Sequence, residues 1–220
     1  MKSPESPAHS PSPLVPEGAG RTPASGPPGR PGIAPPNAAL LERVRARDPE
    51  ALGELYERYF DSVYGLVHRL LGQRAAAEDA ASEVFLKVYR AAHQLDVSRD
   101  PAPWLMTIAT NVCRDLWRSG AYRMSRRSAS LEDNPVVAAM LPSGTNDPER
   151  ALLASEREHL VQEALTQLPE PLRTAIVLHD WQGMSHQDVA VATGIEHAAA
   201  RKRYSRALSA LAKLLKDRLG

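Results

Sequence analysis

Apolar residues recur at steps of three and four through nearly the whole chain after residue 37, and this spacing constrains the fold more than any other feature. One stripe, in the segment AEDAASEVFLKVYR and just beyond it, consists of Ala77, Ala81, Val84, Val88 and Ala91, widened by Phe85 and Tyr89. No stretch has the strict alternation that indicates a half-buried strand, and no internal repeat is visible. The sequence therefore predicts an all-α protein.

Proline and glycine divide the chain into segments. Residues 1–37 hold 11 of the 19 prolines and few apolar residues, so we expect a disordered, proline-rich N-terminal extension. Residues 38–120 are expected to form a first domain of four helices, followed by a flexible linker over residues 121–151. Residues 152–220 are expected to form a second domain, cut into four helices at LPEP, WQGMS and TGIEH. The fold class is thus two small helical domains joined by a linker.

Helix boundaries are clearest in the first domain. Asp48 is a suitable N-cap with Pro49 at the first helical position, and the helix that follows is expected to stop at Gly72. After a loop around QLDVSRDPAP, a last helix is expected at about residues 102–119.

Composition excludes several kinds of site. Lysine plus arginine (27) nearly equals aspartate plus glutamate (26), so net charge predicts no partner. Cys113 is the only cysteine, which rules out an internal disulfide and a zinc site of several cysteines. We expect no metal, no cofactor and no small-molecule substrate. Without a membrane-length apolar run or a signal peptide, the chain is expected to be cytoplasmic, with no direct membrane insertion.

The far side of the stripe helix is acidic. Asp79, Glu83, Leu86 and Arg90 align at three- and four-residue steps, which places an exposed leucine within a charged face. Such a face is most often only solvated, and the alternative is a partner site.

A polar row also follows the helix at residues 102–119. Thr107, Asn111, Arg114 and Arg118 lie opposite the apolar side, and Arg123 continues the row. Amides, hydroxyls and guanidinium groups in line can contact phosphates and base edges, and a base could stack on Trp117. The alternative is an ordinary solvated face with a basic tail.

The second domain has the pattern of a helix-turn-helix. Ser185 and Asp188 can form a capping box, and Gly194 supplies the turn. The last helix is basic, with seven lysines and arginines against two acids from residue 196 onward. Lys202, Arg206 and Lys213 are expected to point outward, with Arg201 and Arg203 on the flanks. Its expected buried stripe is Ala200, Tyr204, Ala207, Leu208, Leu211 and Leu215. A helix of this kind fits the DNA major groove.

The order of these parts resembles a bacterial extracytoplasmic-function (ECF) sigma factor, a small two-domain class of the sigma-70 family that directs RNA polymerase to promoters. The resemblance covers roughly residues 40–215 and rests on AEDAASEVFLKVYR, PWLMTIATNVCRDLWR, LPEPLRTAIVLHDWQGMSHQDVAVATG and RKRYSRALSAL in this order. It implies a region 2 helical bundle and a region 4 helix-turn-helix that perform no covalent chemistry. The implied partners are core RNA polymerase, at its largest-subunit clamp helices and its flap, promoter DNA and an anti-sigma factor.

The resemblance also implies a role for particular residues. Docking on the clamp helices falls to Asp79, Glu83 and Leu86, with Val84 and Phe85 left as core. Recognition and melting of the minus-ten element fall to Asn111, Arg114 and Arg118, with Trp117 and Arg123. Recognition of the minus-thirty-five element falls to Lys202, Arg203 and Arg206.

The chain departs from the family pattern at the start of the recognition helix. Many members have Ser-Glu-Gly-Thr-Val-Lys-Ser-Arg there, whereas this chain has EHAAARKR, with Glu196 and Ala199 in place of the capping serine and the DNA-facing threonine. Loss of a good cap costs about 1 kcal/mol, so the helix is expected to start later or to depend on packing. Promoter preference cannot be carried over base by base.

Two other classes of function stay open on the sequence. A free-standing helix-turn-helix regulator would account for the second domain but would leave the acidic face of the first unexplained. His179 and Asp180 are adjacent, as in metal-dependent phosphohydrolases, but the other histidines are scattered. Cys113 has no evident histidine partner that would make it a nucleophile.

Overall fold

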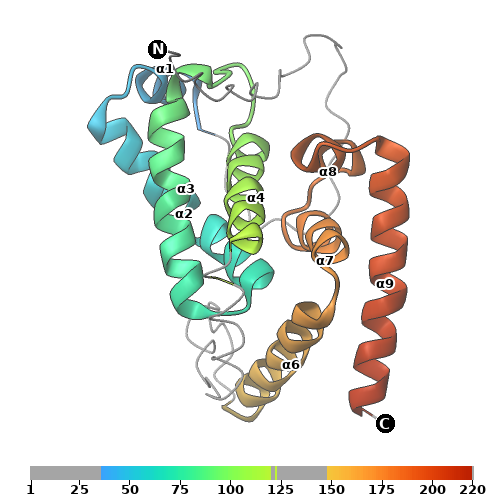
Figure 1. The fold of residues 1–220 in the computed structure, drawn as a ribbon. Coiled ribbons are helices and arrows are strands. Elements are labelled where there is room, and N and C mark those ends of the chain that lie inside the picture. Colours follow the sequence, from blue (N-terminus) through green and yellow to red (C-terminus); the bar gives the residue numbers. More distant parts are fainter. Residues whose placement is uncertain (1–35, 120–121, 123–147, 220) are drawn as a thin grey trace, which may run out of the picture.

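The computed structural model describes residues 36–119, 122 and 148–219, and every regular element in these ranges is helical (Figure 1). The first domain contains α1 (Ala38–Arg45), α2 (Pro49–Leu71), α3 (Arg74–Ala91), a 3-10 turn (Ala92–Gln94) and α4 (Ala102–Arg118). The second contains α6 (Pro148–Gln167), α7 (Glu170–Ile176), a π-helical turn (Val177–Trp181), α8 (His186–Thr193) and α9 (His197–Leu219). The prediction of an all-α protein is confirmed.

Local capping explains where α2 begins and ends. The Asp48 carboxylate accepts hydrogen bonds from the amides of Glu50 and Ala51, and Pro49 occupies the first helical position. Gly72 ends the helix in the left-handed conformation, with φ of 75°. Both ends lie where the sequence predicts them.

The second-domain helices are also broken where expected, although α6 begins at Pro148, inside the segment predicted to be linker. Within that linker residue 122 is also described, whereas residues 121 and 123–147, like the proline-rich residues 1–35, lie outside the described residues. The described helices include none that is both long and apolar enough to span a membrane.

Three details of the predicted stripes are wrong. Tyr89 and Leu208, both assigned to buried stripes, are 49% and 42% exposed. Ala80, which was not assigned to the stripe, is buried, because α3 packs against both α2 and α4 and so buries a wider arc than one stripe covers.

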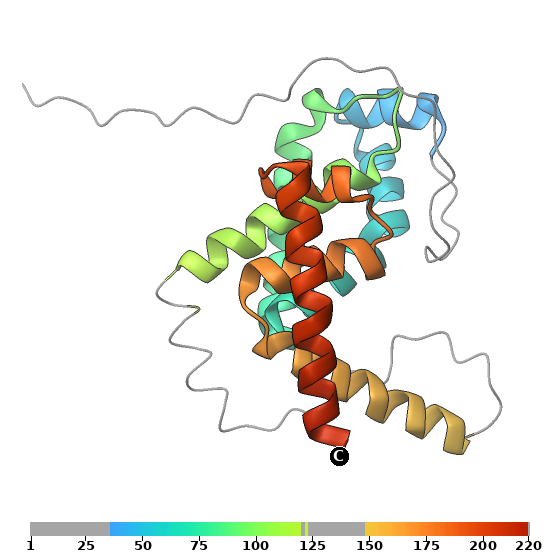
Figure 2. The ribbon, with the colours of Figure 1, turned by 90° about the vertical axis from the view of Figure 1, so that its right-hand side faces the viewer.

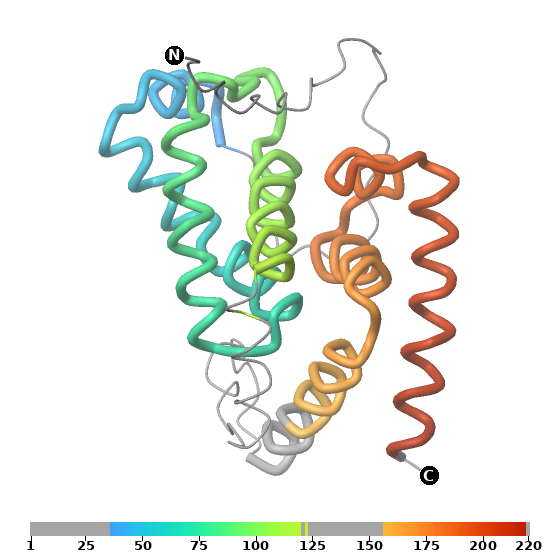
Figure 3. Tube along the Cα trace, in the orientation of Figure 1, coloured from blue at the N-terminus to red at the C-terminus, as the bar shows by residue number. Residues whose placement is uncertain are grey.

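The two domains pack against each other. Helix α4 lies between α3 on one side and α7 and α8 on the other (Figures 1 and 3). One apolar core continues through both domains, and residues such as Leu66, Leu105 and Ile176 belong to it. Helix α9 runs along the outside of the second domain (Figure 2). The sequence predicts both helical units but not this contact between them.

The C-terminal end of α2 is the centre of that contact. The last four carbonyls of an α-helix have no partner within the helix. In α2 the His68 carbonyl accepts from the Gly72 amide, and the side-chain amide of Gln162 lies 3.3 Å from His68 O and 3.4 Å from Arg69 O. The Tyr122 hydroxyl donates to Leu71 O at 2.8 Å. Side chains distant in sequence therefore satisfy this helix end.

The Leu70 carbonyl is bound by Arg173 of α7, which is 1% exposed. The same guanidinium donates to Thr166 O at 2.6 Å and to Leu168 O at 3.0 Å, beside the end of α6. Helix C-termini carry partial negative charge, so two of them provide a polar environment for a buried cation. Packing here is tight, because a Cβ at Gly72 would lie 2.4 Å from Thr166 Cγ2.

Replacing Arg173 with methionine should lower the free energy of unfolding by about 3 kcal/mol or more, because buried carbonyls of both domains lose their donor. Urea denaturation followed by circular dichroism measures the change. Arg157→Met, at an exposed arginine of α6, is the control and should stay within about 0.5 kcal/mol of the parent protein. Equal stability of the two variants would contradict this role for Arg173.

Candidate protein-binding and nucleic-acid-binding faces

The acidic face of α3 borders a groove against α4. Asp79 is exposed, Glu83 is half-buried, and both line this groove. Lys87 of α3 bridges to Asp115 of α4 across it, with 3.2 Å between Nζ and Oδ2. The groove is completed by the apolar side chains of Ala80, Val112 and Leu116. Two of the three predicted docking residues therefore share one groove, which is largely apolar and in which most of the charged side chains are acidic.

Leu86 does not line this groove, but it is 51% exposed, as predicted for a residue that contacts a partner. Sequence reasoning did not identify the exposed aromatic residues Tyr56 of α2 and Tyr89 of α3. The Tyr56 ring lies 4.6 Å from that of Phe85, which is half-buried rather than core. Exposed tyrosines beside an exposed leucine are typical of protein interfaces. The position of Tyr89 at the edge of the apolar stripe was the one sequence feature that could have indicated its exposure.

The middle of the polar row of α4 faces the second domain. Asn111 Oδ1 accepts from Arg114 at 2.9 Å, and Arg114 Nη2 donates to the Thr193 carbonyl at the end of α8 at 3.3 Å. Partial burial, with the positive charges of Arg118 and Arg203, lowers the pKa of Arg114, although Asp115 opposes the shift. The structure therefore brings Asn111 and Arg114 together, but against protein.

Trp117 is not available for stacking in this arrangement, contrary to the sequence-based expectation. Its side chain is 7% exposed, and the Arg173 guanidinium lies over its ring at 6.0 Å from the centroid. Its indole Nε1 is buried without a hydrogen-bond partner. Arg118 stays exposed, whereas Arg123 lies outside the described residues.

The helix-turn-helix has the predicted local geometry. Ser185 and Asp188 form a reciprocal capping box, and Gly194 has φ of 67°. Helix α9 begins at His197 with the first bond from the Ala200 amide to the Glu196 carbonyl, so loss of the serine cap does not delay the helix. Lys202 and Arg206 are exposed and Arg203 is half-buried, so α9 presents a basic outer face.

The His179–Asp180 pair has structural partners. The His179 Nδ1–H donates to the Met184 carbonyl at 2.7 Å, since a carbonyl can only accept, and Asp180 accepts from the Tyr204 hydroxyl at 2.9 Å. The rings of His179 and His186 stack with 4.3 Å between centroids. Within the described ranges, no three histidine, cysteine or acidic side chains converge as metal ligands. The pair thus joins the π-helical turn to α8 and α9.

Cys113 is enclosed in the core. Its side chain is 0% exposed, and burial raises the pKa of its thiol to about 12. A thiol with this pKa carries almost no thiolate at neutral pH, which is the opposite of what a nucleophile needs.

Cys113 should react with a disulfide reagent such as dithionitrobenzoate at least about 100-fold more slowly in the native protein than in denaturant, because neither thiolate nor access is available. Thionitrobenzoate absorbance at neutral pH gives both rates. A Ser82→Cys variant, with its new thiol on the exposed side of α3, supplies the reference rate for an accessible cysteine. Rapid native labelling of Cys113 would disprove this prediction.

Comparison with protein families matches both domains. Residues 55–123 match Sigma-70 region 2, and residues 158–211 match Sigma-70 region 4. The first match covers most of α2 and the whole of α3 and α4. The second covers α7, α8 and the first part of α9. The two matched regions together exceed half of the chain.

Three curated relatives match this chain over nearly their whole length. RNA polymerase sigma-H factor of Pseudomonas aeruginosa is 32% identical over 82% of this chain and 94% of its own. RNA polymerase sigma factor CarQ of Myxococcus xanthus is 35% identical over 80% of this chain and 95% of its own. ECF RNA polymerase sigma factor SigW of Bacillus subtilis is 29% identical over 80% of this chain and 95% of its own.

Solved structures share the fold. CnrH, in complex with the cytosolic domain of CnrY, aligns with a TM-score of 0.58 at 24% identity, covering 82% of this chain and 97% of CnrH. The sigma factor RpoE of Bartonella quintana, in complex with the anti-sigma factor NepR, aligns with a TM-score of 0.57 at 22% identity. The alignment covers 74% of this chain and 96% of RpoE. Two matched regions in the right order and full-length relatives above 30% identity establish that this chain belongs to the ECF sigma factors of the sigma-70 family.

Proposed function

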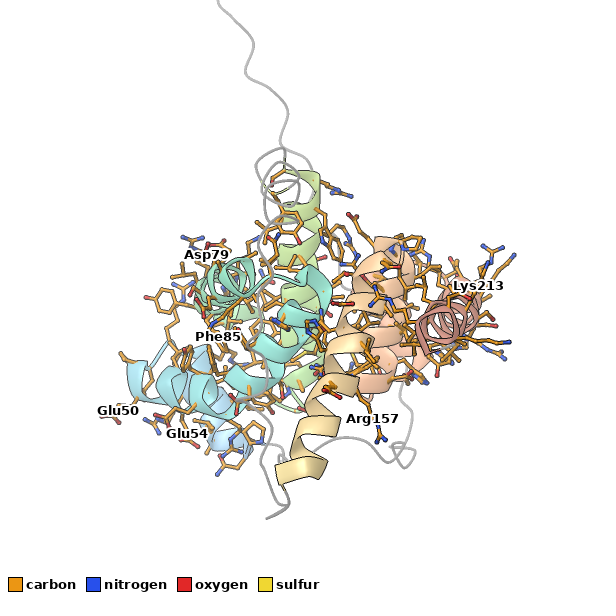
Figure 4. The ribbon with its side chains drawn as sticks, turned by 90° about the horizontal axis from the view of Figure 1, so that it is seen from below. Glu50, Glu54, Asp79, Phe85, Arg157 and Lys213 are labelled. Atoms are coloured by element: carbon orange, nitrogen blue, oxygen red, sulfur yellow. The ribbon has the colours of Figure 1, made fainter. Side chains whose placement is uncertain are left out.

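We propose that this protein binds core RNA polymerase and directs it to specific promoters, where it supports recognition and opening of the DNA strands. The observation that supports this most strongly is that an acidic face and a basic face lie on opposite sides of the same chain. Asp79 lies on one flank of the molecule, and Lys213, on the basic helix α9, lies on the other (Figure 4). A protein that joins an enzyme to DNA needs two such faces.

The first face is the proposed docking site for the polymerase clamp helices. Asp79 and Glu83 supply negative charge beside the groove, and Leu86 and Tyr89 supply exposed apolar surface. Apolar contact provides affinity, while the carboxylates select a basic partner surface and its orientation. Tyr56 extends this face onto α2.

The second face is the proposed reader of the minus-thirty-five element. The exposed side chains of Lys202 and Arg206 project from the early part of α9, where a recognition helix enters the major groove, and Arg203 flanks them. Asn111, Arg114 and Arg118 of α4 are proposed to act on the minus-ten element. Trp117 and Arg123 remain proposals for the same element, and Trp117 can serve only after its cover moves away.

We also infer that an anti-sigma factor regulates this chain. The support is the fold shared with RpoE of Bartonella quintana, whose structure contains its anti-sigma factor NepR. RNA polymerase and promoter DNA occupy the bacterial cytoplasm, so the proposed function places this protein there.

Reversing charge at the docking face should abolish promoter-dependent transcription. In run-off transcription with purified core polymerase and genomic promoter fragments, Asp79→Arg with Glu83→Arg should reduce specific transcript at least about tenfold, because it reverses charge complementarity. The matched control is Glu50→Arg with Glu54→Arg, an equal charge change on exposed acids of α2 (Figure 4), and it should remain active.

The competing reading is a regulator that binds DNA without polymerase. It would be supported if the wild-type protein gave no transcript and did not comigrate with core polymerase while it still shifted duplex DNA alone. Equal loss of activity in both double variants would instead reject the assignment of docking to α3.

Removing charge from the outer face of α9 should weaken promoter binding by the holoenzyme. Lys202→Ala with Arg206→Ala should raise the dissociation constant about tenfold or more and reduce its dependence on salt, since fewer phosphates are neutralised. Fluorescence anisotropy of labelled promoter DNA at several salt concentrations measures both effects. Lys213→Ala with Lys216→Ala, later on the same helix, should have less effect. The reverse order would show that another part of α9 faces the DNA.

A further inference from the structure

Three aromatic rings link the helix-turn-helix to the turn that precedes it. His179 of the π-helical turn stacks on His186, the first residue of α8, with 4.3 Å between ring centroids and 19° between ring planes. The Tyr204 ring of α9 meets His179 edge-on at 4.4 Å and lies 5.0 Å from His186. All three residues are half-buried. Each of the three elements thus contributes one ring to what we call the histidine cluster.

The histidine cluster lies beside the proposed DNA-contacting residues of α9. Lys202 and Arg206 are each two positions away from Tyr204 along the helix. The Tyr204 hydroxyl donates to Asp180 Oδ1 at 2.9 Å, so the same side chain also fixes α9 to the π-helical turn by a hydrogen bond. A change in the cluster therefore acts directly on the early part of the recognition helix.

Proton uptake by the two stacked histidines is unfavourable in this geometry. Imidazole is the side chain that gains charge between about pH 5 and pH 8, and a charged ring carries an N–H at both nitrogens. Nδ1 of His186 is buried and finds no hydrogen-bond partner among the described residues, so a proton there would have no acceptor. Neutral rings stack favourably, whereas two adjacent cations repel each other.

The surroundings of His186 also favour its neutral form. Burial has the largest effect in lowering the pKa of His186. Three groups that are or can become positive lower this pKa further, and they are His179, Arg201 and His197. Asp180 opposes the shift. The N-terminus of α8, where His186 lies, carries partial positive charge and likewise disfavours a cation.

The remaining ionisable groups at the cluster are already engaged. Asp188 of α8 forms the capping box with Ser185. The pKa of Tyr204 is raised by burial and by its hydrogen bond to Asp180, so this phenol stays neutral in neutral and acidic solution. Protonation of the cluster in mild acid therefore falls to the histidines.

The direction of the effect of pH on stability follows from these shifts. The pKa of His186 is lower in the native chain than the ordinary histidine value of about 6.5, so the unfolded state binds more protons as the pH falls. The stabilisation contributed by the neutral cluster is therefore complete above about pH 6.5 and is lost progressively in more acidic solution.

We propose that the histidine cluster is a proton-sensitive contact, which holds the recognition helix α9 in place while His179 and His186 are neutral and loosens it in mild acid. Loosening displaces Lys202 and Arg206, so binding to promoter DNA weakens. The contact itself does not depend on the proposed function, whereas its effect on DNA binding rests on it.

Hydrogen exchange of the full-length protein measures whether α9 loosens. Between about pH 7.5 and about pH 5.5, the protection of amides 198–206, corrected for the intrinsic exchange rate, should fall about fivefold or more. His186→Phe keeps a stacked ring that cannot be charged, so its α9 should keep its protection. The matched control is His93→Phe, at an exposed histidine of the first domain, and it should behave like the parent protein.

A second variant changes the same contact in the opposite direction. In Asp180→Asn an oxygen can still accept from Tyr204, but the carboxylate that favours a charged His186 is gone. This variant should therefore lose more protection than the parent over the same pH range. Nuclear magnetic resonance of the ring signals follows protonation itself, and His186 should take up its proton at a lower pH in the native chain than in urea.

Promoter binding by the holoenzyme tests the consequence for DNA. Added positive charge strengthens binding to phosphates, so protonation alone would lower the dissociation constant in acid. Loosening of α9 has the opposite sign. Between the two pH values, fluorescence anisotropy should show the dissociation constant of the parent rising about threefold more than that of His186→Phe.

The outcomes separate this inference from the proposed function. Equal acid-induced loss of protection in the parent and His186→Phe would overturn the proton-sensitive contact, as would proton uptake by His186 at the same pH in the native chain and in urea. If His186→Phe does not fold, an Asp180→Asn variant that loses no more protection than the parent would overturn it instead. Loosening of α9 without the difference in dissociation constant would overturn the effect on DNA. Exchange and resonance measurements need no polymerase, so they decide on the contact even if no holoenzyme forms, a result that would count against the proposed function.

Discussion

The contact on which the whole structure depends is the satisfaction of the last carbonyls of α2. A helix that ends inside a protein must find donors for these groups, because a buried carbonyl without a partner is costly. Here the donors are the Gly72 amide, the Tyr122 hydroxyl, the Gln162 amide and the Arg173 guanidinium. Three of the four are side chains that follow α4 in sequence, so the two domains cannot separate without exposing this helix end to water.

This dependence explains why a fully buried arginine is tolerated. Burying an isolated guanidinium in apolar surroundings would be prohibitive. Arg173 instead lies among carbonyls at the ends of α2 and α6, with the face of Trp117 against it. The partial charges of the helix ends and the electron-rich ring face both favour a cation. Charge and packing thus act together at the point where the domains meet.

Much of the fold could be predicted because short stretches of sequence determine where its helices begin and end. Asp48, Gly72, Ser185 and Gly194 each mark a helix end through their own backbone or side-chain preferences, and each is found at such an end. The exposed positions of Asp79, Leu86, Lys202 and Arg206 likewise follow from helical spacing. These features need only a few neighbouring residues.

The interdomain contact could not be predicted in this way, and neither could the burial of the proposed site residues that depend on it. Trp117 has an ordinary position at the end of an amphipathic helix, and only Arg173, 56 positions later, decides whether its ring is covered. Arg114 matched a phosphate-binding pattern, yet its bond to Thr193 spans 79 positions. Helical spacing reports which side of a helix is polar but not what lies opposite. Tyr89 was missed as a surface residue for the related reason that an aromatic residue is first assigned to the core.

The capped end of α2 also limits how this chain can vary. Each residue of an α-helix turns the backbone by about 100° and advances it by about 1.5 Å. A single insertion or deletion within α2 would therefore rotate its final carbonyls away from Arg173, Gln162 and Tyr122, even if every apolar side chain could be repacked. The contacts that the second domain makes with the end of α2 therefore fix the number of residues in that helix. The length of α2 is set by the packing of both domains and not by the first domain alone.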